Sequence, residues 1–170
     1  YKTYYLVNLD DPQDYYGLDR DKDLYLNVVA TSQTQAKKYL FADIAMTVLG
    51  CKALQPYILK AQEEEIRIQT PSDRRKRAEL KKSGVKVAKD LASVRITANA
   101  STGKSGRGGA AFMQAFDEFA HGIDTGSTLS ASEVYEAYTP SLAQLGNDGL
   151  IYVPSSPWTS TGKFYELCCD

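Results

Sequence analysis

Two short stretches carry side chains whose types and spacing suit phosphate chemistry. Residues 98–105 read A-N-A-S-T-G-K-S, which satisfies the phosphate-loop pattern of a small residue, four spacers and then Gly-Lys-Ser. Residues 112–118 form an apolar run that ends in Asp117 and Glu118. Two carboxylates at the end of a buried strand can hold the water shell of Mg²⁺ and polarise an attacking water. The same pair can equally be two solvated acids that close a strand.

The stretch around Gly103-Lys104-Ser105 lacks the helix that a phosphate loop needs. In such a loop the Lys lies where the chain turns into a helix, whose backbone N–H groups then face the phosphates. Here three glycines follow within four residues, and each disfavours a helix by about 1 kcal/mol relative to Ala. A parallel crossover of a dozen or more residues does not fit before the next strand, near residue 110. The sequence therefore favours a glycine-rich loop that carries Lys104 and Arg107.

Hydrophobic periodicity predicts the elements that must position these residues. A buried strand at 24–30 is followed by a helix at 33–49, which begins with a capping box formed by Ser32 and Gln35. A second box, Ser130 with Glu133, opens another helix. Alternating strands and helices favour an α/β three-layer fold. The other expected elements are strands at 65–69, 93–98, 110–116 and 149–153, and helices at 130–138, restarting at 140, and 163–167.

Composition limits the possible compartments and partners. The chain has 170 residues and a formal net charge of −1, so any nucleic acid must be held by a local patch. Three cysteines, with Cys168 and Cys169 adjacent, are not typical of a disulfide framework and favour a reducing compartment. No apolar run approaches the roughly 20 residues of a membrane span, and no signal peptide is visible. We therefore expect no membrane partner.

A basic segment at 73–90 is the one local patch of this kind. It holds eight Lys and Arg residues against three acids. Arg74, Arg75 and Arg77 are candidates for weak contacts to DNA phosphates, which would be independent of base sequence and sensitive to salt. A solvated helix face explains the same composition and is the favoured interpretation.

The chain from Leu24 to Glu166 resembles the ATPase domain of tailed-phage terminase large subunits, the motors that pump DNA into proheads. The stretches NVVATSQTQAKKYLF, EIRIQTPSDRR and ASTGKSGRGG are similar to the part of that domain between the nucleotide loop and Walker B. MQAFDEFAH resembles Walker B itself, and EVYEAYTPSLAQLGNDGLIYVPSSPWTSTGKFYE the segment that follows it. The resemblance implies a P-loop NTPase-like fold of the ASCE type, with a mostly parallel sheet flanked by helices.

The resemblance also implies roles for individual residues, with ATP and Mg²⁺ as cofactors. Asp117 would hold Mg²⁺ through water, and Glu118 would activate the attacking water. Ser155 and Ser156 would form a coupling motif that senses the γ-phosphate. Arg107 would reach the ATP of a neighbouring subunit, although a surface loop residue explains it equally well.

The resemblance further implies that residues 1–170 are an incomplete ATPase domain. The family's Walker A segment would precede them and its nuclease domain would follow, so these residues alone would be inactive as an ATPase. The expected partners are dsDNA, a portal protein, a small terminase subunit and further copies of the chain in a ring. The expected location is the host cytoplasm, outside the mature virion.

Two other functions stay open at this point. One is a helicase-like ATPase with the same Asp-Glu chemistry but no adjoining nuclease. The other is a non-catalytic nucleic-acid-binding module that uses residues 74–89. Glu118 discriminates between the classes, because only an enzyme would lose turnover when this side chain becomes Gln.

Overall fold

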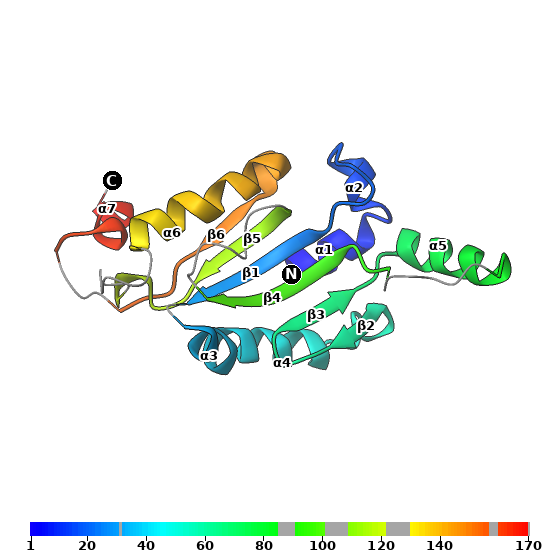
Figure 1. Cartoon of the computed structure of the whole chain (residues 1–170), viewed down its shortest axis with the longest axis horizontal. Helices are drawn as coiled ribbons and strands as arrows, with labels where there is room; N and C mark the ends of the chain where they lie inside the picture. Colours follow the sequence, from blue (N-terminus) through cyan, green and yellow to red (C-terminus); the bar gives the residue numbers. More distant parts are fainter. Residues whose placement is uncertain (31, 85–90, 101–108, 122–129, 157–159, 170) are drawn as a thin grey trace.

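One mixed sheet organises the chain. The computed structural model describes residues 1–30, 32–84, 91–100, 109–121, 130–156 and 160–169, and within these ranges six strands lie in the order β2-β3-β4-β1-β5-β6 (Figure 1). Strands β4, β1, β5 and β6 are parallel, whereas β3 is antiparallel to both β4 and β2. The predicted α/β fold with a mostly parallel sheet flanked by helices is therefore confirmed. The strands are β1 (Leu24–Ala30), β2 (Ile58–Ala61), β3 (Glu65–Ile68), β4 (Val94–Ala100), β5 (Ala110–Phe116) and β6 (Leu150–Tyr152).

Helices on one face of the sheet cover its larger core. These are α1 (Lys2–Asn8) and one continuous helical run made of α3 (Gln33–Ala36), a π-helical turn (Lys37–Phe41) and α4 (Ala42–Gly50). The run confirms the helix predicted at 33–49, but the π turn was not predicted. Ala36 and Phe41 are both buried, and the i→i+5 pattern of a π turn explains how residues five apart share one face.

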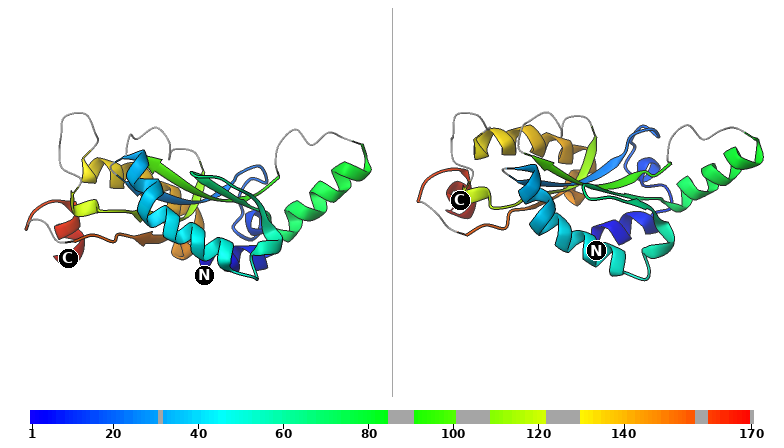
Figure 2. Two further views of the ribbon diagram at one scale, coloured as in Figure 1. Left: turned by 90° about the horizontal axis from the view of Figure 1, so that it is seen from below. Right: turned by 60° about the horizontal axis from the view of Figure 1, so that its bottom comes forward.

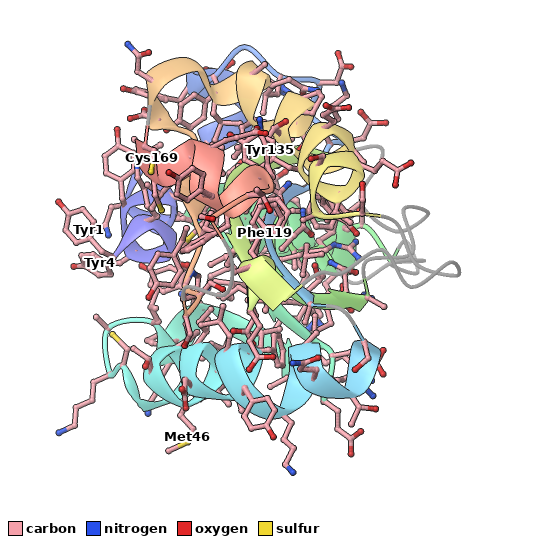
Figure 3. All side chains as sticks on the ribbon, turned by 90° about the vertical axis from the view of Figure 1, so that its left-hand side faces the viewer. Tyr1, Tyr4, Met46, Phe119, Tyr135 and Cys169 are labelled. Carbon is pink, nitrogen blue, oxygen red and sulfur yellow. The ribbon has the colours of Figure 1, made fainter. Side chains whose placement is uncertain are left out.

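The opposite face carries a second, aromatic core beneath α6 (Ala131–Tyr138) and the 3₁₀ segment η4 (Thr139–Asp148). Met46 of α4 and Tyr135 of α6 lie on opposite sides of the sheet in Figure 3. The ring of Phe116, the last residue of β5, packs against Phe119 and Tyr138. The predicted Ser130–Glu133 capping box is present in both directions. The strand that precedes Asp117 is thus buried on both faces, as its apolar run predicts.

Helix α5 (Pro71–Lys82) extends away from the rest of the molecule (Figure 2). It begins at Thr70, which forms a capping box with Asp73. The sequence predicted only a basic segment in this region, and the cap was not predicted. The remaining short elements are α2 (Pro12–Tyr15), η2 (Gln55–Tyr57), η3 (Phe119–His121) and α7 (Lys163–Cys169).

The connection between β4 and β5 corrects one expectation. We expected no room for a parallel crossover before residue 110, yet β4 and β5 are parallel and lie on either side of β1. Nine residues can extend about 30 Å, which exceeds the roughly 23 Å of a seven-residue strand, so no crossover helix is required. Residues 101–108 of this connection lie outside the described ranges. Gly109 follows them, and a Cβ there would lie 2.2 Å from the Tyr25 ring, which explains one glycine of the run.

Among the described residues, no helix combines the length and the apolar character needed to cross a membrane.

Candidate functional site

Asp117 and Glu118 lie where three parallel strands end together. The backbone N–H of Asp117 donates to the carbonyl oxygen of Val29 in β1 (2.8 Å), and that of Glu118 donates to Pro154, just after β6 (3.1 Å). The two acids therefore follow β5 at the carboxyl edge of the sheet, between the ends of its two neighbours. Open α/β sheets bind ligands at this edge, so the placement agrees with the sequence-based expectation.

Glu118 has an unusual backbone conformation. Its φ of +50° lies in the left-handed region, which costs a residue other than glycine on the order of 1–3 kcal/mol where the surrounding structure holds it. Its side chain is exposed, and Oε2 accepts a hydrogen bond from Nε2 of Gln35. A glycine at position 118 would avoid this backbone cost but would carry no carboxylate. The turn therefore exposes a carboxylate to solvent at the expense of backbone strain.

Asp117 is half-buried, and one of its carboxylate oxygens is enclosed by protein. Its Oδ2 is buried and accepts no hydrogen bond from the described residues. Burial raises the pKa of the Asp117 carboxyl above its usual range, the charge of Glu118 adds to the rise, and backbone N–H groups of Glu118 and Leu40 oppose it. A nearby cation would favour the charged form of such a carboxylate, so the orphaned oxygen fits Mg²⁺.

Asp117 offers a single carboxylate as a possible metal ligand. The described residues contain no cluster of three or more His, Cys, Asp or Glu side chains that could hold an ion. Mg²⁺ typically takes one or two carboxylates and completes its shell with waters and substrate phosphates. Asp117 would supply the carboxylate, and the ion would neutralise the charge of a bound phosphate group.

Ser155 joins the ends of β5 and β6. Its Oγ accepts a hydrogen bond from the backbone N–H of Ala120 (2.9 Å) in η3, two residues beyond Glu118. The Ser155 hydroxyl therefore contacts the turn that carries Asp117 and Glu118, so a movement of Ser155 can change the position of this turn. Ser156 is exposed, while Arg107 and Lys104 lie outside the described residues.

Gln35 is the site residue that sequence reasoning missed. Its only predicted role was in a capping box with Ser32. The structure contains one bond of that box, from the backbone N–H of Gln35 to Ser32 Oγ (3.2 Å). The contact of its side chain with Glu118 spans 83 residues. Only the juxtaposition of β1 and β5 could have revealed it, and no local pattern reports which strands are neighbours.

The basic residues of α5 lie at the other end of the sheet, and some of them already contact side chains of the same molecule. Arg75 forms two hydrogen bonds with the Asp10 carboxylate (2.7 and 2.5 Å), and the Arg74 guanidinium lies over the Tyr57 ring. Arg77 is half-buried, whereas Lys76, Lys81 and Lys82 are exposed. Of the candidate DNA contacts named from sequence, two thus have partners within the molecule.

A polar hollow of about 340 Å³ beside α5 is not a convincing phosphate site. Its charged lining groups balance, since three cations face three acids. They are Arg20, Arg75, Lys76, Asp11, Asp73 and Glu79.

Comparisons with known proteins do not assign the chain to a family. No protein-family model matches it, and no curated protein matches it.

Proposed function

We propose that this protein is a nucleoside-triphosphate hydrolase, the ATP-driven motor domain of a terminase-like large subunit that translocates dsDNA. The observation that carries the proposal is the acid pair at the carboxyl edge of the sheet. Asp117 Oδ2 is buried with no hydrogen-bond partner among the described residues, and Glu118 is held at positive φ. The strand order around the pair and the sequence resemblance support a P-loop NTPase-like fold.

In this proposal the two acids divide the work. Asp117 would hold Mg²⁺, which offsets the charge of the β- and γ-phosphates. Glu118 is exposed and lies next in the chain, so it can accept a hydrogen bond from water and direct that water at the γ-phosphate. Ser155 would link phosphate occupancy to the acid turn through its bond with Ala120. The motor assignment extends this chemistry to dsDNA, a portal protein, a small terminase subunit and a ring of copies.

A change of Glu118 to Gln tests the hydrolytic role in the native full-length protein. The amide keeps the size of the side chain but cannot act as a base, so turnover of Mg-ATP should fall by at least about 10²-fold. The dissociation constant for Mg-ATP should stay within about twofold, because the change affects the transition state rather than the ground state. Phosphate release and equilibrium nucleotide binding are the measurements.

Glu136→Gln is the matched control for this experiment. Glu136 is also an exposed glutamate, but it lies on α6. Its variant should retain full turnover. Full turnover in Glu118→Gln would contradict the proposed function.

A nucleic-acid-binding module is the second candidate, and the geometry of α5 favours it. The helix projects from the body. Lys76 in its middle and Lys81 and Lys82 in its last turn are exposed. Such a surface can contact DNA phosphates without reading bases. It is compatible with the motor, which also needs to hold DNA.

A further inference from the structure

Gln35 and Glu118 meet at the carboxyl edge of the sheet although they are far apart in the sequence. The side-chain amide of Gln35, on the helix after β1, donates to one carboxylate oxygen of Glu118, after β5. Gln35 is half-buried and Glu118 is exposed. The contact therefore joins the helix α3 to the exposed carboxylate of Glu118.

The helix holds Gln35 in place from several directions. Ala36, the next residue, is fully buried in the core against the sheet. Ser32 caps the start of α3 through the backbone N–H of Gln35. Lys37 forms an ion pair with Glu64 in the turn between β2 and β3. A side chain on such a supported element can orient a partner, whereas one on a loose loop cannot.

The backbone of Glu118 is fixed as well, but its side chain is not. The hydrogen bond to Pro154 and the positive φ define where its Cα lies. The carboxylate still hangs on three rotatable bonds in solvent, and catalysis requires it in one geometry. Among the described residues, the side-chain amide of Gln35 forms a hydrogen bond that restricts these rotations.

We propose that Gln35 is a positioning residue that orients the Glu118 carboxylate toward the attacking water. This inference rests on the proposed hydrolytic function. A carboxylate has about four acceptor positions, so the oxygen that Gln35 does not use can still accept a hydrogen bond from water. A base that is itself oriented by a third group is the general arrangement for activating a nucleophile.

The chemistry of an amide suits this task better than that of a cation. A Lys or Arg at position 35 would orient Glu118 equally well, but its charge would stabilise the carboxylate and make it a weaker base. The amide of Gln is neutral, so it can orient the Glu118 carboxylate while lowering its basicity less.

Turnover and binding of Mg-ATP by the full-length protein with Gln35→Met test the proposal. Met keeps the length and helix propensity of Gln but has no donor. We expect kcat to fall about tenfold, as for a modest misplacement of a catalytic group, with the dissociation constant for Mg-ATP within about twofold. Gln35→Glu should lower kcat further, because its carboxylate repels Glu118. Thr34→Ala, an exposed change on the same helix, should leave both quantities unchanged.

A second measurement reads the contact without any hydrolysis. In the nucleotide-free protein, the NMR resonances of the Gln35 side-chain amide should shift when Glu118 is replaced by Ala, and stay unchanged when Glu136 is replaced. A merely structural role for Gln35 would lower the unfolding midpoint of Gln35→Met and change kcat and binding together.

The outcomes separate this inference from the proposed function. If Glu118→Gln abolishes turnover while Gln35→Met leaves kcat unchanged or raises it, the positioning role is wrong and the hydrolase stands. If Glu118→Gln retains full turnover, the hydrolase and the positioning role both fail, even where the NMR contact is present.

Discussion

At the scale of a single residue, Asp117 carries a carboxyl group whose charged form the fold disfavours. Its carboxyl has a raised pKa because it is buried and lies beside Glu118, and one of its oxygens accepts no hydrogen bond from the part of the chain that the structure describes. The folded protein therefore binds more protons than the unfolded chain between the two pKa values, so the free energy of unfolding falls as the pH rises through that interval. The charged form of Asp117 therefore destabilises the fold.

Asp117→Asn should accordingly stabilise the nucleotide-free protein at pH 7. We expect a rise in unfolding midpoint on the order of 1–2 °C for a chain of this length, since solvent screens this partly exposed group. The difference should shrink below pH 4, where Asp117 is protonated in both states. Calorimetry at pH 7 and pH 3 measures it, with the exposed Asp21→Asn as control. A variant that is less stable than the parent at pH 7 would contradict the argument.

At the scale of elements, Asp73 fastens α5 to the sheet. Its Oδ2 accepts from the backbone N–H of Thr70 (2.9 Å) and of Ser93 (2.8 Å), and its Oδ1 accepts from the Ser93 hydroxyl (2.6 Å). The carboxylate thus caps the helix and also holds the residue that precedes β4. Asp73, the first acid of the basic segment, is therefore a buried residue that connects α5 to β4.

Asp73→Ala should destabilise the fold by about 3 kcal/mol. The change removes three hydrogen bonds to a charged acceptor and leaves buried donors unpaired, in addition to the loss of a helix cap. Urea unfolding followed by circular dichroism measures the difference. Glu79→Ala on the exposed side of α5 should stay within about 0.5 kcal/mol, and an equal loss in both variants would mean that Asp73 has no special role.

Across the whole molecule, the acid pair and α5 lie at opposite edges of the sheet. Ile68, at the end of β3, is paired with Val94, the first residue of β4, whereas Asp117 follows the last residue of β5. Figure 1 shows the same separation, with α5 beyond one end of the sheet and α3 at the other. The proposed DNA contacts of α5 and the proposed hydrolysis at Glu118 should therefore be separable by mutation.

Replacing Lys76, Lys81 and Lys82 together by Ala should weaken dsDNA binding and leave Mg-ATP binding unchanged. Each lost phosphate contact should reduce the salt dependence of log K by about 0.9, so the slope should fall by roughly 3 if all three contact DNA. Titrations of labelled duplex at several salt concentrations measure this slope. A slope equal to that of the parent would show that α5 does not contact DNA.

Local sequence determined much of this protein. The strands at 24–30 and 110–116 were predicted with their observed bounds, and the Ser130–Glu133 box opens α6 as expected. Apolar runs and caps are short-range signals, so they can be read within one element. The acids after residue 116 were placed at the carboxyl edge of the sheet for the same reason: the buried strand before them fixes where they emerge.

Only the tertiary structure decided which strands are neighbours. It placed β1 between β4 and β5, which made the connection between those two a crossover and brought Gln35 to Glu118. It also paired Arg75 with Asp10 and buried Asp73 against Ser93. These contacts join residues 20 to 83 positions apart. Their geometry depends on how the sheet is ordered, and periodicity along the chain carries no record of that order.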